Sequence, residues 1–122
     1  MVNKVILIGR LGRDVESKQT SSGTSIATFS LATDELVKKD NGKKEVHTEW
    51  HRITAFGKLA EHCVEHLRKG RLVYVEGKLR TSKYEDKDGI TRYITEVYAS
   101  TIKFLDSKKT DASGDEEDEV PF

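Results

Sequence analysis

One stretch near the middle of the 122-residue chain places aromatic and basic side chains on the same face of a predicted strand. Residues 47–56 are expected to alternate with a period of two, so that one face carries Trp50, Arg52 and Phe56. Trp50 and Phe56 lie six residues apart, about 20 Å at the usual rise of a strand, which suits two separate stacking positions. Unpaired nucleotides need flat rings for their bases and cations for their phosphates. The strand therefore predicts a contact surface for single-stranded nucleic acid.

The alternative for this strand is that Trp50 is an ordinary core tryptophan. Arg52 on the same face argues against that alternative, because a charged group does not fit inside the core of a small barrel. We therefore expect the Trp50 indole to be open to solvent.

A predicted hairpin further along the chain combines the same residue types. Asp88-Gly89 is a strong signal for a two-residue turn between Tyr84 and Tyr93. The predicted hairpin carries one candidate stacking ring and several cations, namely Arg80, Lys83, Tyr84, Lys87 and Arg92. We expect a basic arm in which Tyr84 contacts the nucleic acid, the alternative being an ordinary solvated hairpin.

The segment 62–66 offers a competing chemistry, because it matches the H-x-x-E-H pattern of some zinc peptidases. Such a site also needs a third ligand from a distant segment and a cleft that excludes water, and a domain this small offers neither easily. We expect His62 and His66 on the solvent face of a helix whose other face, with Leu59, Cys63, Val64 and Leu67, covers the core. The sequence thus predicts no catalytic site, no metal and no cofactor.

The elements that must position these residues are mostly strands. Apolar and β-branched runs bounded by turn residues predict five strands, at 5–8, 24–33, 47–56, 71–80 and 91–104. Residues 34–46 are polar, with Asp40-Asn41-Gly42 as the turn residues. A helix of about three turns, ending near Gly70, separates the third strand from the fourth. Such all-β structure predicts a small barrel or sandwich. A five-stranded barrel with one α-helix between strands 3 and 4 would be the oligonucleotide-binding (OB) fold.

Charge divides the chain into two parts although the totals, 21 basic and 21 acidic residues, cancel. Residues 1–105 carry a net charge of +5 and residues 106–122 a net charge of −5. We expect residues 1–105 to be the folded domain and 106–122 a disordered acidic tail. The tail ends on the apolar residues Val120, Pro121 and Phe122, which is unusual for a purely solvating segment and is typical of a peptide ligand.

Location is predicted from two further features. Cys63 is the single cysteine, which favours a reducing, cytoplasmic environment. No stretch approaches the roughly 18 apolar residues needed to cross a bilayer, and no signal peptide is visible. We therefore expect no membrane partner.

Several blocks in order along residues 2–104 resemble the bacterial single-stranded DNA-binding protein (SSB) family. They are Val2-Asn3-Lys4-Val5-Ile6-Leu7-Ile8-Gly9, Leu11-Gly12, Thr48-Glu49-Trp50-His51-Arg52, Phe56-Gly57-Lys58-Leu59-Ala60-Glu61, Leu67-Arg68-Lys69-Gly70 and Val73-Tyr74-Val75-Glu76-Gly77. The last five residues, Asp118-Glu119-Val120-Pro121-Phe122, are similar to the acidic tip of that family.

The resemblance implies an OB-fold homotetramer that binds single-stranded DNA during replication, recombination and repair, in the cytoplasm and on the nucleoid. By position it implies stacking by Trp50, Phe56 and Tyr84, and basic contacts from Lys4, Arg52, Lys58, Lys69, Arg80 and Lys83. It places His51 and Tyr74 at subunit contacts. The acidic tip, Asp118, Glu119, Val120, Pro121 and Phe122, would recruit helicase, nuclease, primase or polymerase subunits.

Two alternatives remain open at this point. An OB-fold primosomal adaptor would bridge proteins and bind DNA weakly, but it would lack the aromatic and basic strand and the acidic tip. An RNA-binding OB domain stacks bases in the same way, since stacking tolerates either sugar.

Overall fold

The computed structural model describes residues 1–106 of the chain. Within them the elements follow in the order β1 (Val5–Leu11), β2 (Glu16–Gln19), β3 (Ser25–Lys38), β4 (Lys44–Phe56), α1 (Gly57–His66), β5 (Leu72–Glu85) and β6 (Thr91–Phe104). The five predicted strands and the helix are all present, and β2 is a short addition that the sequence pattern did not indicate, because its four residues are all exposed.

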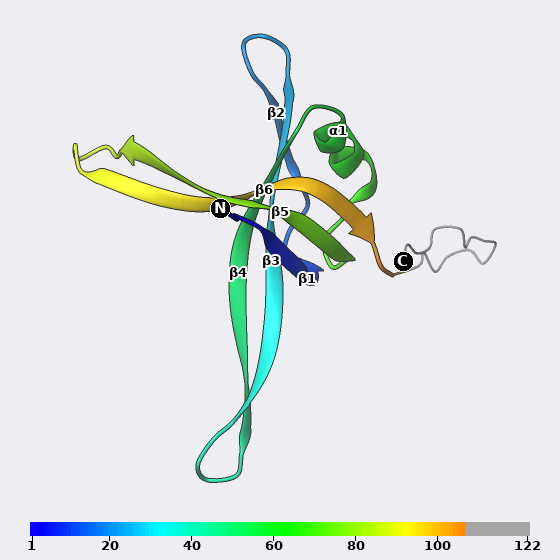
Figure 1. The fold of residues 1–122 in the computed structure, drawn as a ribbon, viewed down its shortest axis with the longest axis vertical. Coiled ribbons are helices and arrows are strands. Elements are labelled where there is room, and N and C mark those ends of the chain that lie inside the picture. Colours follow the sequence, from blue (N-terminus) through cyan, green and yellow to red (C-terminus); the bar gives the residue numbers. More distant parts are fainter. Residues whose placement is uncertain (107–122) are drawn as a thin grey trace, which may run out of the picture.

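The sheet closes on itself into a five-stranded barrel (Figure 1). Strands β1, β5, β6, β4 and β3 are neighbours in that order, and β1 returns to pair with β3 at Leu11 and Leu31. All pairings are antiparallel except the one between β4 and β6. The helix lies in sequence between the third and fourth barrel strands, which confirms the predicted OB-type arrangement.

The core is built by alternation along the strands and by one face of the helix. In β3, for example, Ala27, Phe29 and Leu31 are buried while their neighbours are only partly covered. The buried apolar residues are Leu11, Ala27, Phe29, Leu31, Ile53, Ala55, Ala60, Cys63, Leu67, Val73, Val75 and Val97. Because these side chains fill the barrel, the aromatic residues predicted to bind bases are left outside it.

Helix α1 covers the core with a narrower face than predicted. Ala60 and Cys63 are buried, and Leu59 packs against the core from the edge. The prediction for Val64 is wrong, because its side chain is 40% exposed. Ala60 and Cys63 form the centre of the buried face of the helix, and Val64 lies at the edge of that face. His62 and His66 are exposed, as expected.

The end of the helix also differs from the expectation. The helix stops at His66, and Leu67 already has extended backbone angles. Gly70 therefore does not cap the helix. It occupies a separate turn between Arg68 and Arg71 with a φ of +87°, a conformation that favours glycine, and its N–H donates to the carbonyl of Leu11.

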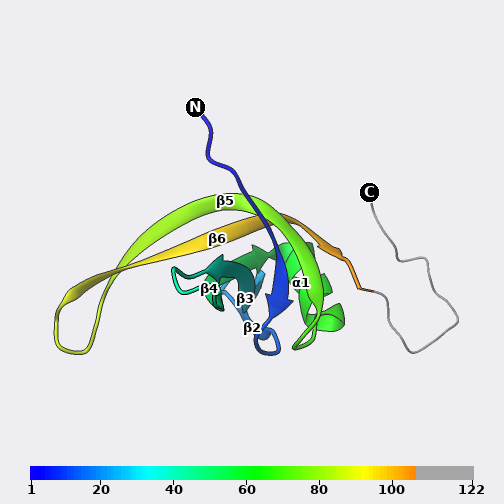
Figure 2. The same ribbon diagram turned by 90° about the horizontal axis from the view of Figure 1, so that it is seen from below.

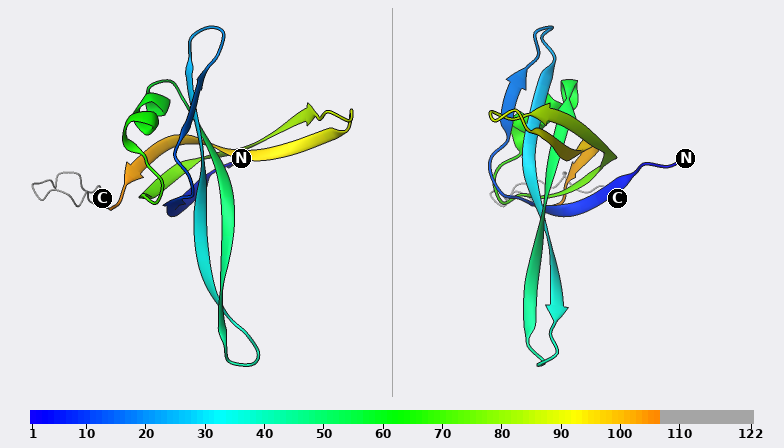
Figure 3. Two further views of the ribbon diagram at one scale, coloured as in Figure 1. Left: turned by 180° about the vertical axis from the view of Figure 1, so that it is seen from behind. Right: turned by 90° about the vertical axis from the view of Figure 1, so that its left-hand side faces the viewer.

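Two long hairpins leave the barrel, as Figures 1 and 3 show. The β3–β4 hairpin turns at the predicted Asp40-Asn41-Gly42, where the Gly42 N–H donates to the carbonyl of Lys39. Its ladder continues to the pair Lys38 and Lys44, so residues 34–38 and 44–46 are strand, beyond the predicted strand ends at 33 and 47. Cross-strand backbone hydrogen bonds hold these residues as strands although they bury little apolar surface. The second hairpin, β5–β6, runs to the pair Glu85 and Thr91, and Figure 2 shows it reaching away from the barrel.

The tip of the β5–β6 hairpin is a three-residue turn rather than the predicted two-residue one. The N–H of Asp86 donates to the carbonyl of Ile90, and the N–H of Gly89 donates to the carbonyl of Asp86. Gly89 has a φ of +77°, as expected for the last residue of this turn type. The Asp86 carboxylate accepts from the backbone N–H groups of Asp88 and Ile90 and from Arg92, so it fixes the turn.

The predicted disordered tail and the candidate tip residues 118–122 lie outside the described residues. Among residues 1–106, no helix is long and apolar enough to cross a membrane.

Candidate nucleic-acid interface

The outward face of β4 presents the predicted aromatic and basic side chains to solvent. Trp50 is 58% exposed and Phe56 is 41% exposed, and Arg52 between them is exposed as well. The exception on this face is Thr54, which is buried because it lies between its partners Thr28 on β3 and Tyr98 on β6. The prediction that Trp50 lies outside the core is confirmed.

Strands β6 and β5 continue this face away from β4. Glu96 and Tyr98 on β6 reach Arg52 and Phe56 on β4, through a hydrogen bond and a ring contact respectively. Across the β5–β6 ladder, Glu96 is paired with Arg80. Since residues directly opposite in a ladder share a face, these strands form one surface. We call it the aromatic–basic face; it consists of Trp50, Arg52, Phe56, Lys78, Arg80, Tyr84, Arg92, Glu96 and Tyr98.

The position of Trp50 depends on a glycine in the connection after β1. A side-chain carbon on Gly12 would lie 2.7 Å from Cη2 of the indole, which is closer than real contacts allow. The indole therefore lies directly over the Gly12 backbone, while more than half of the tryptophan stays exposed. A ring supported on one side and open on the other is suited to stack on a base.

Two of the predicted DNA-contacting cations already have carboxylate partners in the described structure. Arg52 Nε lies 2.9 Å from Glu96 Oε2, and Lys4 Nζ lies 2.9 Å from Glu76 Oε2. The hydrogen bond to Glu76 raises the pKa of Lys4, and the same bond lowers the pKa of Glu76. A phosphate that bound either cation would compete with its carboxylate.

The remaining predicted cations are spread over several elements. Lys58 is exposed on the first turn of α1, beside Phe56, and Arg80 lies with its guanidinium carbon 5.6 Å from the Tyr98 ring centre. Lys69 is exposed in the turn after the helix, where its backbone N–H donates to Asp14. The structure thus brings Arg80 to the aromatic–basic face and leaves Lys69 beside the connection between β1 and β2.

The two sides of the β5–β6 hairpin separate the basic arm into two groups. Tyr84, 51% exposed, is paired with Arg92. The next pair, Lys83 and Tyr93, points to the opposite side because neighbouring residues of a strand alternate. Tyr84 therefore belongs to the aromatic–basic face, and Lys83 lies on the reverse of the hairpin.

The two residues predicted at subunit contacts take part in separate hydrogen bonds. The Tyr74 hydroxyl donates to Glu76 Oε1 at 2.8 Å, which raises the pKa of Tyr74. His51 is partly buried, with Nε2 2.9 Å from Thr33 Oγ1. Tyr74 lies beside Ile8 on the β1–β5 ladder, where Ile6 and Ile8 are more than half exposed.

Sequence reasoning missed three members of the interface: Gly12, Glu96 and Tyr98. Tyr98 and Glu96 alternate correctly along β6, but the face they occupy depends on the pairing of β6 with β4 and β5. Gly12 is adjacent to Trp50 only because β1 closes the barrel against β3. Nothing in the order of residues alone indicated these contacts.

The competing chemistries find no support in the site. Burial raises the pKa of the Cys63 thiol to about 11, so the thiol is not a nucleophile at neutral pH. His62 and His66 lie with ring centres 5.8 Å apart on the exposed side of α1. Within residues 1–106, no group of three or more histidine, cysteine or acidic side chains is arranged to hold a metal ion.

A comparison with protein families agrees with this geometry. The model of the "Single-strand binding protein family" matches residues 2–105. The chain belongs to this family. The proteins of this family bind DNA and have no catalytic activity.

Individual relatives are similar over most of the chain. "Single-stranded DNA-binding protein 1" of Chlorobaculum tepidum is 47% identical over 108 residues, which are 88% of this chain and 67% of that protein. The "Single-stranded DNA-binding protein" of Xanthomonas axonopodis pv. citri is 47% identical over 85% of this chain and 58% of its own length. The "Single-stranded DNA-binding protein" of Neisseria meningitidis serogroup A is 44% identical over 93% of this chain and 65% of its own length. This chain therefore spans about two thirds or less of the length of the curated relatives it matches.

A solved structure also resembles the chain. It is described as "Plasmodium falciparum SSB complex with ssDNA", with a TM-score of 0.79 and 38% sequence identity, and the alignment covers 87% of this chain and 96% of that one.

Proposed function

We propose that this chain binds single-stranded DNA without sequence preference and protects it during replication, recombination and repair. The observation that carries the proposal is the aromatic–basic face, where exposed Trp50, Phe56 and Tyr84 are interleaved with Arg52 and Arg80. Every base has a face that can stack and every nucleotide has a phosphate, so such a surface accepts any sequence. Membership of the single-strand binding protein family supports the same function.

The proposal predicts a definite salt dependence. If each chain neutralises about five phosphates, the slope of log affinity against log salt is about −3.5. Between 50 and 200 mM salt the affinity per chain then falls about a hundredfold. A nearly flat slope would mean that the cations of the face do not contact phosphates.

A titration with oligo(dT) tests the proposal directly, because Trp50 is the single tryptophan and its fluorescence reports on its own surroundings. We expect quenching on binding, and a loss of more than tenfold in affinity for Trp50→Ala, measured by the anisotropy of a labelled strand. Unchanged affinity in a folded Trp50→Ala protein would refute the stacking role. Equal competition by oligo(U) would favour an RNA-binding domain, and very weak binding would favour the adaptor.

We also propose that the chain assembles as a homotetramer through surfaces that include His51 and Tyr74. The exposed apolar pair Ile6 and Ile8 beside Tyr74 supports this, since apolar side chains gathered on one strand face favour burial against a second copy. The mass in solution, with and without a strand of about 70 nucleotides, tests it. A monomer under both conditions would contradict the proposal.

The acidic tip is proposed to recruit replication and repair enzymes such as helicase, nuclease, primase or polymerase subunits. Deleting residues 118–122 should leave DNA binding intact or slightly tighter, because a negatively charged segment that competes with DNA is shortened. Phe122→Ala is the matched control. It removes the terminal ring and should abolish capture of partners, but it keeps the charge of the tail and should therefore leave the DNA affinity unchanged. If neither variant changes capture, the tip has no such role.

Because its proposed partners are single-stranded DNA and the enzymes of replication and repair, we propose that the protein acts in the cytoplasm, on the nucleoid. Fluorescence microscopy of a tagged full-length chain tests this location.

A further inference from the structure

Tyr98 occupies a place on the aromatic–basic face that neither the strand pattern nor the family resemblance assigned. It lies on β6 between Lys78 of β5 and Thr54 of β4, directly opposite both in the ladders. Its ring centre is 5.1 Å from that of Phe56, with an angle of 67° between the planes. The edge-to-face geometry is a favourable aromatic contact.

The ring of Tyr98 also connects Phe56 to the cations of β5. The Arg80 guanidinium carbon lies 5.6 Å from the Tyr98 ring centre, within the range of a cation–π contact. Arg80, Tyr98 and Phe56 therefore form a continuous row that crosses three strands from the hairpin to the start of α1. The row begins on the β5–β6 hairpin, which also carries Tyr84, and ends at Phe56, six residues along β4 from Trp50.

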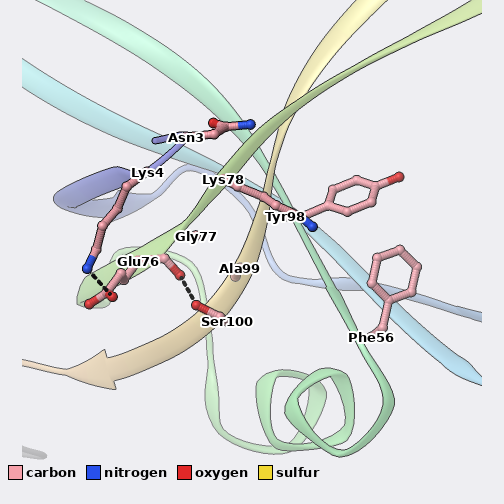
Figure 4. Close-up of a pocket in the computed structure, with 9 residues that line it drawn as sticks. All are labelled: Asn3, Lys4, Phe56, Glu76, Gly77, Lys78, Tyr98, Ala99 and Ser100. Atoms are coloured by element: carbon pink, nitrogen blue, oxygen red, sulfur yellow. Dashed lines mark hydrogen bonds and ion pairs between the residues drawn. The ribbon is translucent and has the colours of Figure 1, made fainter. Parts of the chain in front are cut away.

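A groove of about 490 Å³ opens beside this row, which is the size of many small-ligand sites. Figure 4 shows the rings of Tyr98 and Phe56 on one side of the groove and the Lys4–Glu76 ion pair on the other. Lys78 also lines the groove and is exposed; within residues 1–106 no ion pair engages it.

The electrostatics of the groove suit a polyanion. The acidic side chain lining the groove, Glu76, is paired with Lys4 at 2.9 Å and accepts a hydrogen bond from Tyr74. Its charge is therefore compensated, while the charge of Lys78 is free to meet a phosphate. The Tyr98 ring is partly exposed, and its hydroxyl makes no hydrogen bond to the described residues.

We propose that Tyr98 and Lys78 form a further contact site for single-stranded DNA, in which a base packs against the Tyr98–Phe56 pair and Lys78 binds the adjacent phosphate. This inference rests on the proposed function. It adds a base contact at Tyr98 to those at Trp50, Phe56 and Tyr84, so that the rings that contact a bound strand lie on β4, β6 and β5.

The test compares ring variants of the full-length chain by the anisotropy of a labelled oligo(dT). Tyr98→Leu should weaken binding about five- to fiftyfold, as expected for a lost stacking contact, whereas Tyr98→Phe keeps the ring and should stay within about twofold. Thermal melting shows whether each variant is folded. If wild type binds and a folded Tyr98→Leu binds equally well, this inference fails alone; if wild type does not bind, the proposed function fails.

A double-mutant cycle separates direct contact from support of Phe56. In a Phe56→Leu background, Tyr98→Leu should still weaken binding at least threefold. If it has no further effect there, Tyr98 only holds the Phe56 ring and the direct contact is refuted. A strand carrying 5-iodouracil should in addition crosslink to Tyr98 under light, and crosslinks that map only to other residues would contradict the assignment.

The phosphate contact has its own readout. Lys78→Gln should reduce the magnitude of the log–log salt slope by about 0.7, the value expected for one phosphate on a single strand. Lys18→Gln is the matched control and should leave the slope unchanged, since Lys18 is exposed on β2, outside the aromatic–basic face and the groove. Equal slopes for Lys78→Gln and wild type would refute the role of Lys78.

Discussion

Replacing Gly12 by alanine tests whether the position of the Trp50 indole sets the affinity for single-stranded DNA. The added methyl carbon would lie 2.7 Å from Cη2 of the indole, whereas ordinary contacts begin at 3.4 Å. Cζ3 of the indole would lie closer still, so the ring must withdraw by more than about 0.7 Å or rotate. The Gly12 N–H can keep its hydrogen bond to the Ser30 carbonyl, and its backbone does not need a positive φ, so the fold should tolerate alanine.

The size of the effect follows from the stacking energy. Complete loss of one base–aromatic stack costs about 1–3 kcal/mol, which is about five- to 150-fold in affinity. A displaced ring keeps part of its contact, so we expect a loss of about three- to thirtyfold for Gly12→Ala. The loss of affinity for Gly12→Ala should not exceed the loss for Trp50→Ala, which removes the ring completely.

The assay is the anisotropy of a labelled oligo(dT) at two salt concentrations, with thermal melting as the control for folding. The decisive comparison is Gly12→Ala in a Trp50→Ala background, where the effect should vanish because no indole remains to be displaced. Wild-type affinity for Gly12→Ala would refute the argument. An equal loss in both backgrounds would refute it too, since the alanine would then act through the backbone.

Three further predictions concern the core, the thiol and the hairpin turn. Ile53→Ala removes a fully buried side chain and should lower the free energy of unfolding by about 2–5 kcal/mol in urea denaturation, and a loss below about 1 kcal/mol would contradict its place in the core. Because burial raises the pKa of Cys63 to about 11, iodoacetamide should alkylate it far more slowly in the native protein than in urea at pH 8; equal rates would show an exposed thiol. Arg92 and the N–H groups of Ile90 and Asp88 lower the pKa of Asp86. Its stabilisation of the turn is therefore fully present above the ordinary value of 3.8 and is lost as the pH falls through the lowered pKa of the folded protein. Hydrogen exchange of the Ile90 amide, corrected for its intrinsic rate, should accelerate below about pH 4, and protection independent of pH would refute this role.

The comparison of prediction and structure shows where local pattern suffices. The alternation of Trp50, Arg52 and Phe56 was enough to predict their shared exposed face, because the period of a strand is fixed by its own backbone. The helix was likewise predicted from its own spacing, although its flank at Val64 was not. Both successes concern contacts within one element.

The errors lie where neighbouring strands decide the outcome. Residues 34–38 and 44–46 lack a buried face, yet they extend the β3–β4 hairpin because the two strands satisfy each other's backbone hydrogen bonds. The turn between Asp86 and Ile90 has three residues rather than two, because the register of β5 and β6 pairs Glu85 with Thr91. Both errors concern the pairing of two consecutive strands, on which the alternation pattern within a single strand contains no information.

The order of residues by itself determined the all-β class, the helix between the third and fourth predicted strands, and the rings and cations of β4, since periodicity and turn chemistry act over a few neighbours. Only the tertiary structure decided that Gly12 supports the Trp50 indole and that Tyr98 joins Phe56 to Arg80. These contacts join residues 38, 42 and 18 positions apart. The β1–β3 and β4–β6 pairings that close the barrel bring the first two together, and the register of the β5–β6 hairpin brings the third together.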